Sequence, residues 1–367
     1  MASNQTMLDK EVLSAVLSQR ERVTGKKPAG TKAALPVIIT YPPGYKKFSE
    51  VFGFVPPSGM DHAVIVHDVA SWPVEARAFI PEKDPGYVFQ PEETEMLVVG
   101  FMSGDKILAH GPKGSGKTTL PEQVCALLNW PFLCVNGRRD LETGQLLGMN
   151  SVDIDPVLKI SEVRWHDGTL TEAARWGAVF LMDEIGRNMP GVNTCMQKVL
   201  EDNGVLYLAD KPGTSTEKRV VPHKWFRFVA TDNTALQGDV TGKYASTMVQ
   251  DESLLDRFDT AIYLDYLSKD HELAVLAKRT PNTPEAIRKS IVQFAGLVRD
   301  AYKQGRVQFT LSLRGLIKWS KKVEYWGNAQ RAFYFSFYNK LTDDDKKIVG
   351  ELYNQAFGYD PNDFING

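Results

Sequence analysis

Residues 111 to 118 read Gly111-Pro112-Lys113-Gly114-Ser115-Gly116-Lys117-Thr118. This stretch fits G-x-x-x-x-G-K-S/T, the pattern of a loop whose backbone N–H groups surround a polyphosphate. Glycine lets the backbone bend so that these groups point inward at the start of the next helix. We therefore expect a nucleotide site formed by Gly111, Pro112, Lys113, Gly114, Ser115, Gly116, Lys117, Thr118 and Thr119.

The segments on either side of this loop have the character that the motif requires. The apolar run 107–109 precedes it and predicts a short strand. Apolar residues then recur at Leu120, Val124 and Leu127, which is one face of a helix. In this setting Lys117 supplies a positive charge to the outer phosphates, and Thr118 offers its hydroxyl to Mg²⁺. The predicted ligands are therefore ATP and Mg²⁺.

A second feature is a pair of acids at the end of a predicted buried strand. The run 178–182 is apolar throughout, which is typical of a strand covered on both faces, and Asp183 and Glu184 follow it. Two carboxylates in such a place are costly unless something pairs with them. Mg²⁺ bound to ATP would do so, with Asp183 holding the metal and Glu184 polarising the attacking water. The alternative is that the acids cap the helix that follows.

Two further candidates follow predicted strands or helices. Asn233 comes just after the strand predicted at 226–231, where it would hydrogen-bond the attacking water or the γ-phosphate; the alternative is a residue that forms a turn. Arg257 would be an arginine finger that stabilises charge on the ATP of a neighbouring subunit. Its alternative is a local ion pair with Asp256.

The last candidate is Arg314, in the first turn of a helix predicted to begin at Ser312. A cation at a helix N-terminus opposes the helix dipole, so an anionic partner such as phosphate would explain it. The alternative is an ordinary surface arginine.

The remaining patterns describe a chain of alternating strands and helices followed by helices alone. We predict an α/β fold with a five-stranded parallel sheet and flanking helices, an α-helical lid, and a small N-terminal region. The predicted domains are residues 1–85, 86–266 and 267–367. A short helix at 1–22 and a linker at 24–36 belong to the first. Further expectations are a helix at 91–103, strands at 132–135 and 262–264, hairpins at 157–166 and 205–221, a helix at 190–202, and a polar, mobile loop at 234–250.

Three helix starts and two helix ends carry specific signals. Thr169 with Glu172 matches a capping box, and Thr283 with Pro284 matches an N-cap followed by proline at the first helical position. Thr342 is the expected N-cap of the last helix. The expected ends are Trp176, before Gly177, and Gly358.

Composition limits the function classes. The 367 residues are 43% hydrophobic and 24% charged, with a net charge of −2, so a nucleic-acid partner is disfavoured. No apolar run is long enough to span a membrane, and the three cysteines lack C-x-x-C spacing. We expect a cytoplasmic protein in a reducing compartment, with no membrane partner.

Taken together, these segments resemble the AAA+ ATPases. The run 183–188, Asp-Glu-Ile-Gly-Arg-Asn, is similar to the D-E-I-N-R motif of MoxR-type proteins. Over roughly residues 86–360 the chain further resembles the CobS family of aerobic cobaltochelatase subunits. The segments that carry this likeness are 128–131, 238–244, 255–257 and 355–358.

The resemblance implies a ring of identical subunits, usually hexameric, and a partner with a von Willebrand A-type domain. In the chelatase, ring and partner drive cobalt insertion into a corrin held by a large subunit. By position, Asn233 corresponds to the first sensor, Arg257 to the finger acting in trans, and Arg314 to the second sensor. The family usually has Ser-Pro-Arg at the second sensor where this chain has Ser-Leu-Arg, so the turn before Arg314 is less constrained.

Three functions remain open at this point. The first is a chelatase motor subunit, although the chain has no His/Cys metal cluster. The second is a MoxR-type remodelling chaperone that acts on a protein complex. The third, a motor that depends on nucleic acid, is disfavoured by the charge balance.

Overall fold

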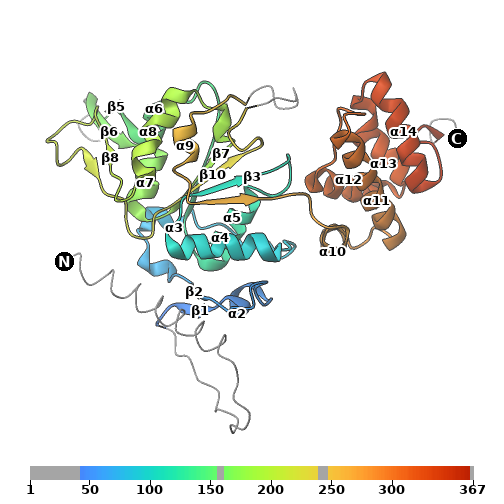
Figure 1. The fold of residues 1–367 in the computed structure, drawn as a ribbon, viewed down its shortest axis with the longest axis horizontal. Coiled ribbons are helices and arrows are strands. Elements are labelled where there is room, and N and C mark those ends of the chain that lie inside the picture. The colour runs from blue at the N-terminus through green and yellow to red at the C-terminus, as the bar shows by residue number, and fades with distance from the viewer. Residues whose placement is uncertain (1–41, 155–160, 239–246, 364–367) are drawn as a thin grey trace, which may run out of the picture. The chain divides into compact units, whose positions relative to one another are not determined.

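The computed structural model describes residues 42–154, 161–238 and 247–363 (Figure 1). The chain divides into two compact units between Ile65 and Val66. The helix predicted at 1–22, the linker at 24–36, the first residues of the 157–166 hairpin and residues 239–246 of the 234–250 loop lie outside the described residues. The domain boundaries expected at 86 and 267 stay predictions.

The described part of the first unit is a small β-hairpin with one short helix. Strands β1 (Tyr45–Lys47) and β2 (Ala63–Ile65) pair antiparallel, and α2 (Phe48–Phe52) follows β1 directly. The rings of Phe48, Phe52 and Phe54 lie 4.5 to 6.4 Å apart, so three aromatic side chains form its apolar contact.

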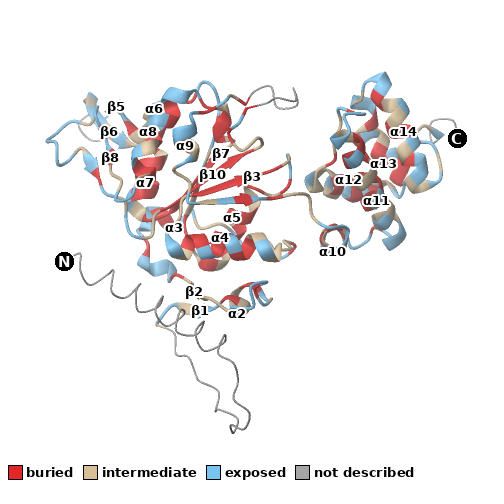
Figure 2. Ribbon diagram, in the orientation of Figure 1, coloured by how far each residue is buried: buried red, intermediate tan, exposed pale blue. Residues whose placement is uncertain are grey.

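A five-stranded parallel sheet forms the centre of the second unit. Its strand order is β11 (Thr260–Tyr263), β3 (Ile107–His110), β10 (Arg227–Asp232), β7 (Val179–Asp183) and β4 (Phe132–Asn136). The three inner strands are almost entirely buried, as Figure 2 shows, because helices cover both faces of a parallel sheet. The predicted five-stranded α/β fold is confirmed.

Helices cover the sheet and connect its strands. They are η1 (Val69–Ser71), α3 (Val74–Arg77), α4 (Pro91–Ser103), α5 (Thr119–Leu128), α6 (Thr143–Leu147), α7 (Thr169–Trp176), η2 (Ile185–Arg187), α8 (Pro190–Leu200) and α9 (Glu252–Leu255). One core packs Phe180, Met182 and Phe228 of the sheet against the apolar sides of α6, α7 and α8. This packing holds the strand ends, where the polar candidates lie, at one edge of the sheet.

Two antiparallel hairpins extend from the α/β part. Strand β5 (Gly148–Ile154) pairs with β6 (Ser161–Asp167), and β8 (Leu206–Tyr207) pairs with β9 (Arg219–Val220). The second hairpin was expected at these residues. The first begins earlier than the alternation at 157–166 indicated, because its first strand starts at Gly148.

The C-terminal part is helical, as predicted. It contains α10 (Lys269–Arg279), α11 (Glu285–Lys303), α12 (Leu313–Trp326), α13 (Ala329–Ser336), η3 (Tyr338–Lys340) and α14 (Asp343–Phe357). Its core stacks aromatic rings, with Phe333 4.7 Å from Tyr353 and Tyr353 4.4 Å from Phe357. We call α10–α14 the lid helices.

Two predicted helix starts are wrong by one residue. Helix α7 takes Gly168 as its N-cap, so Thr169 is its first residue and no capping box forms. Helix α11 takes Pro284 as its N-cap, because the hydroxyl of Thr283 instead donates to the Ser320 carbonyl at 3.1 Å. The N-cap at Thr342 and the ends at Gly177 and Gly358 are confirmed.

Candidate nucleotide-binding site

The loop after β3 adopts a conformation that only glycine allows at several positions. Gly111, Gly114 and Gly116 have φ of 141°, 80° and 100°. A Cβ on Gly111 would lie 2.0 Å from the Leu264 carbonyl oxygen, so the loop leaves the sheet where no side chain fits. Helix α5 begins at Thr119, so the loop leads directly into the N-terminus of a helix, where an anion is favoured.

Lys117 is buried, with 7% of its surface exposed, and points back into the loop. Its ammonium donates to the carbonyls of Gly111 and Pro112, both at 2.8 Å, and to Oδ1 of Asn233 at 3.0 Å. Burial lowers the pKa of Lys117 to about 8, although Asp183 and other acids at this edge oppose the shift. A bound polyphosphate would give this ammonium a negatively charged partner.

The acid pair at the end of β7 is connected to the loop by hydroxyl groups. Thr118 Oγ1 donates to Asp183 Oδ1 at 2.9 Å. Thr231, on β10, also donates to Asp183 Oδ1 and accepts the backbone N–H of Glu184 at 2.9 Å. Asp183 is therefore placed beside the hydroxyl predicted to share its metal, and Thr231 fixes both acids although the sequence analysis did not single it out.

Glu184 has a left-handed backbone, with φ 54° and ψ 47°, directly after the last residue of β7. It occupies the N-cap position of η2, but its side chain accepts no capping hydrogen bond there. Its carboxylate pairs with Arg187 at 2.5 Å. Glu184 thus lies at the sheet edge beside Asp183, with a cation as its partner.

Asn233 lies at the same edge, and the turn is made by its neighbour. Asp232 accepts hydrogen bonds from Thr234 N, Thr234 Oγ1 and Leu236 N at 2.7 to 2.9 Å. The amide of Asn233 is left to contact Lys117. The structure brings Asn233 and Lys117 together, while the sensor role of Asn233 stays a prediction.

The first turn of α12 lies against the phosphate loop. A Cβ on Gly114 would be 2.3 Å from the Cβ of Ser312, which caps α12 by accepting Gly315 N at 3.3 Å. Arg314 stands two residues later and is exposed. The lid helices therefore place Arg314 next to the turn that touches the loop.

Arg257 lies away from the loop of its own chain. It comes just before β11, where Asp259 N and Thr260 N donate to the Lys106 carbonyl at the start of β3. The loop begins at the other end of β3, whose four residues span about 13 Å. The Arg257 guanidinium contacts the Ser253 carbonyl and lies 3.7 Å from Glu201, so its local partner is not Asp256.

The loop fits a bound polyphosphate on two further observations. The Ser115 hydroxyl is buried and has no hydrogen-bond partner among the described residues. A Cβ on Gly116 would meet no atom within 4 Å, so there is open space on that side of the loop. The hydroxyl and carboxylate oxygens of Thr118 and Asp183 are the ligand type that Mg²⁺ prefers.

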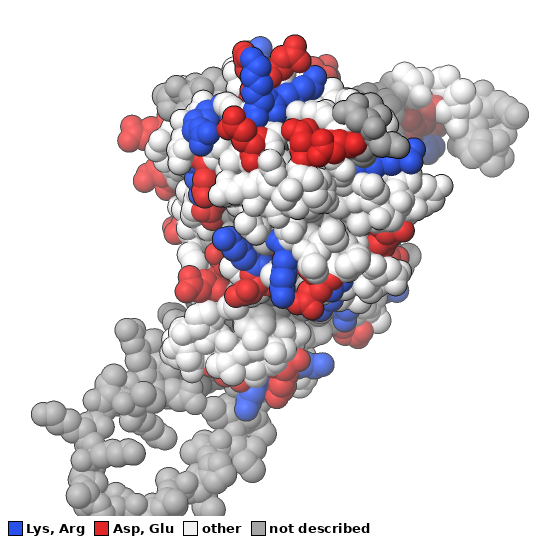
Figure 3. All heavy atoms as spheres, turned by 90° about the vertical axis from the view of Figure 1, so that its right-hand side faces the viewer, with Lys and Arg blue, Asp and Glu red and all other residues white. Residues whose placement is uncertain are grey.

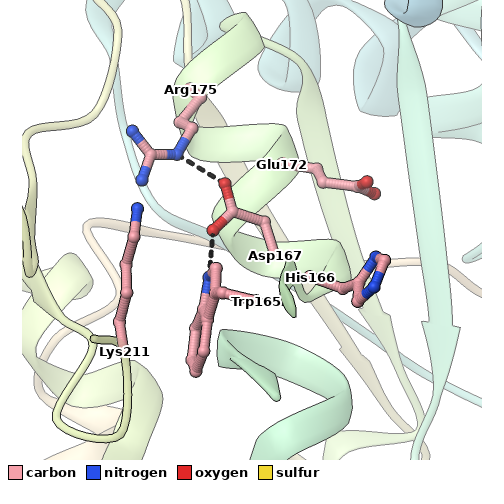
Figure 4. A pocket seen from close by; sticks show the side chains of 6 residues that line it. All are labelled: Trp165, His166, Asp167, Glu172, Arg175 and Lys211. Carbon is pink, nitrogen blue, oxygen red and sulfur yellow. Dashed lines mark hydrogen bonds and ion pairs between the residues drawn. The ribbon is translucent and has the colours of Figure 1, made fainter. Parts of the chain in front are cut away.

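A separate polar hollow of about 580 Å³ lies between the β5–β6 hairpin, α7 and the loop that carries Lys211 (Figure 4). Its lining residues are Trp165, His166, Asp167, Glu172, Arg175 and Lys211. Asp167 accepts Trp165 Nε1 at 2.8 Å and Arg175 Nε at 2.7 Å. Because its central carboxylate is already paired, we place the nucleotide at the sheet edge and not in this hollow.

Sequence reasoning missed several polar residues that shape the site. Thr231 and Asp232 end a buried strand, and polar residues at the end of such a run were the available signal. Arg187 is three residues from Glu184, a spacing that could have indicated the ion pair. Asn193, on α8, and Gln250, 64 residues after Gly186, contact the segment after the acids, and no local pattern indicates them.

The chain is similar to known ATPase families over most of its length. Residues 106–258 match the AAA domain of the dynein-related subfamily, and residues 272–353 match the CbbQ/NirQ/NorQ C-terminal family. The aerobic cobaltochelatase subunit CobS of Sinorhizobium sp is 32% identical over 286 residues, which are 77% of this chain and 84% of that protein. The gas vesicle ATPase GvpN of Ancylobacter aquaticus is 31% identical over 254 residues, or 65% and 66% of the two chains.

Among solved structures, the Thermotoga maritima RuvB Holliday junction branch migration motor has a TM-score of 0.45 and 16% identity, covering 77% of this chain and 87% of that one.

Within the described residues, no helix has the length and apolar character needed to cross a bilayer. On the face drawn in Figure 3, acidic and basic side chains are interspersed and not gathered by sign.

Proposed function

Because this chain belongs to the MoxR-type AAA+ ATPases, in the family of the cobaltochelatase subunit CobS, we propose that it hydrolyses ATP with Mg²⁺ in a ring of identical subunits and uses the energy to remodel a partner complex. One observation carries this proposal. At one edge of the sheet Lys117 is hydrogen-bonded to Asn233 and Thr118 to Asp183, and Thr231 holds Glu184 there.

The residues at this edge divide the chemistry among them. Lys117 and the loop N–H groups hold the phosphates, and Thr118 with Asp183 would hold Mg²⁺. When bound, Mg²⁺ neutralises charge on the phosphate oxygens. Glu184 takes the proton of the attacking water while the bond between the γ-phosphorus and the bridging oxygen breaks, and Asn233 orients that water.

The pocket would be completed by a second subunit. Arg257 lies near the end of β3 opposite its own loop, so we assign it to the ATP of a neighbour, where it stabilises charge on the transferred phosphoryl group. Arg314, beside the loop through Ser312, would contact the phosphates of its own subunit. A hexamer is the ring size that we propose.

Two kinds of client are proposed. Similarity to CobS favours metal insertion together with a subunit carrying a von Willebrand A-type domain. Similarity to gas vesicle ATPases favours the alternative, a remodelling chaperone with a protein client. Affinity purification from the native host separates them, since a large chelatase subunit would co-purify in the first case and a structural protein complex in the second.

Phosphate release by the purified protein with Mg²⁺ tests the ATPase itself. Wild type should hydrolyse ATP, whereas Glu184→Gln should bind ATP with unchanged affinity and hydrolyse it on the order of 10²–10⁴-fold more slowly. Glu172→Gln, which changes a carboxylate of the separate polar hollow, serves as the control and should keep the wild-type rate. Hydrolysis by Glu184→Gln at the wild-type rate would refute the role of this acid.

A further inference from the structure

Three buried amide side chains form a connected network against the turn that follows Asp183 and Glu184. Asn188 Nδ2 donates to Asn193 Oδ1 at 2.9 Å, and Asn193 Nδ2 donates to Gln250 Oε1 at 2.8 Å. Their exposed fractions are 0%, 2% and 8%. We call these three residues the amide network.

The amide network holds the turn that follows Glu184. Gln250 Nε2 donates to the carbonyls of Gly186 at 3.3 Å and Asn188 at 3.2 Å. Asn193 Nδ2 lies 3.4 Å from the Ile185 carbonyl oxygen, which is a weaker contact. The backbone of residues 185–188 therefore depends on side chains from α8 and from the segment before α9.

The turn itself has little freedom to adjust. A Cβ on Gly186 would lie 2.4 Å from Asp232 Oδ1 and 2.8 Å from Thr247 Cγ2, so Gly186 is closely packed on both sides. Met248 N also donates to the Gly186 carbonyl at 2.8 Å. Residues 247–250 are thus packed and hydrogen-bonded directly against the turn that follows Glu184.

The other end of this segment leads to Arg257. Asp251, next to Gln250, is the N-cap of α9 and accepts Ser253 N at 2.8 Å. The Arg257 guanidinium in turn donates to the Ser253 carbonyl. One glutamine therefore connects the turn after the catalytic acid to the short helix that holds the arginine.

We propose that Gln250 is a positioning residue that fixes Glu184 and Arg257 relative to each other. In this way the nucleotide state of a subunit's own ATP site determines the position of the Arg257 that the subunit offers to its neighbour. This inference rests on the proposed function, because it needs Glu184 to act in cis and Arg257 in trans. A buried amide suits this role, since an apolar side chain would leave the Asn188 carbonyl without its donor and the Gly186 carbonyl with the Met248 N–H alone.

The experiment mixes two inactive variants so that each role is isolated. Lys117→Ala subunits cannot hold ATP but still offer Arg257, whereas Arg257→Ala subunits hold ATP but offer no finger. Mixed rings of the two should regain hydrolysis. No activity at any ratio, with mixed rings shown by native mass spectrometry, would overturn the role in trans that the proposed function assigns to Arg257.

Gln250→Met is then added to one variant at a time. Placed with Arg257→Ala it tests the positioning of Glu184, and placed with Lys117→Ala it tests the positioning of Arg257. Because misplacing catalytic groups by about 1 Å costs on the order of 10²-fold, each arrangement should lose at least about tenfold of the restored rate. Restored activity that stays within about twofold in either arrangement would overturn the inference while leaving the proposed function standing.

A matched control uses the same substitution in the lid helices. Gln330 is 8% exposed, as Gln250 is, and donates to the Asp360 carbonyl. Gln330→Met should leave the restored rate unchanged in both arrangements. Retention of a fluorescent ATP analogue by the Arg257→Ala subunits, with and without Gln250→Met, shows that the variant is folded.

A pH profile distinguishes positioning from a loss of packing. Gln250→Glu keeps the acceptor for Asn193, and in its protonated form it regains one donor toward the turn carbonyls. Burial favours that protonated form, so the rate of Gln250→Glu relative to wild type should rise as the pH falls from 8.5 to 6, while the relative rate of Gln250→Met stays flat. Equal, flat profiles for both variants would contradict the hydrogen-bonding role.

Discussion

The ammonium of Lys117 lies 3.0 Å from the amide oxygen of Asn233, a residue 116 positions later in the chain. The two meet because β3 and β10 are neighbouring parallel strands that end at the same edge of the sheet. This contact places a cation and a polar amide where a triphosphate would be bound.

ATP affinity should fall as the pH rises above about 8. The pKa of Lys117 is lowered from 10.5 to about 8 by burial, so the folded protein without nucleotide loses this proton at a lower pH than the unfolded chain does. Between these values the unfolded chain binds more protons, and the free energy of unfolding gains a term that rises with pH. Phosphate favours the charged form, so binding in that range requires proton uptake, at a cost of up to about tenfold in affinity per pH unit.

Calorimetry of ATP binding at pH 9 in two buffers of different ionisation enthalpy measures this uptake. Wild type should take up protons on binding. Residual binding by Lys117→Met should lack the component that Lys117 contributes, and equal uptake by both proteins would exclude Lys117 as its source.

Thr118→Val should weaken the binding of magnesium. The substitution keeps the shape of the side chain but removes the hydroxyl that donates to Asp183 at 2.9 Å. We expect the Mg²⁺ concentration for half-maximal ATP hydrolysis to rise about 10–100-fold, the usual cost of losing a group that orients a metal site. Thr194→Val, which removes a hydroxyl bonded to the Pro190 carbonyl on α8, should leave the Mg²⁺ titration unchanged. Identical titrations for Thr118→Val and wild type would argue against a metal at this place.

Gly114→Ala should reduce ATP affinity through the lid helices. A Cβ there would lie 2.3 Å from Ser312 Cβ, so the loop and the first turn of α12 must separate. Gly104→Ala is the matched control, because Gly104 has a similar φ of 87° but open space around its Cβ. Both variants should lose some stability from the strained backbone, whereas only Gly114→Ala should lose binding of an ATP analogue. Equal affinities would show that the contact with Ser312 does not matter for the site.

Glu272→Ala should destabilise the lid helices strongly. Glu272 and Arg299 form a buried bidentate pair at 2.7 and 3.0 Å, and their side chains are 1% and 8% exposed. Removing the carboxylate leaves the arginine charge buried and unpaired, which costs about 3–5 kcal/mol of unfolding free energy. Urea denaturation should detect this loss.

The exposed pair of Glu285 with Lys289, at 2.7 Å, provides the comparison within the same helices. Glu285→Ala should produce no measurable change, because exposed ion pairs are screened by solvent. Similar losses for Glu272→Ala and Glu285→Ala would mean that burial does not set the energetics of these pairs.

Local chemistry was enough to predict the elements of the site and their order along the chain. The phosphate loop at 111–118, the acids after a buried strand and the helix caps at Ser312 and Thr342 each depend on a few consecutive residues, so a sequence pattern reveals them. The N-caps predicted at Thr169 and Thr283 are each wrong by one residue. Gly168 is the N-cap of α7, and the Thr283 hydroxyl donates to the Ser320 carbonyl instead of capping α11.

By itself, then, the sequence determined a five-stranded α/β nucleotide-binding fold with a helical lid, and the residue types at the strand ends. Only the tertiary structure decided which of those residues meet. Parallel strands joined by long crossovers bring Asn233 to Lys117, Thr231 to the acid pair and Gln250 to the turn after Glu184, and these contacts depend on strand order and packing rather than on sequence spacing. The position of Arg257 near the end of β3 opposite its own loop was decided in the same way, because a side chain's distance from a site depends on which end of a strand it flanks.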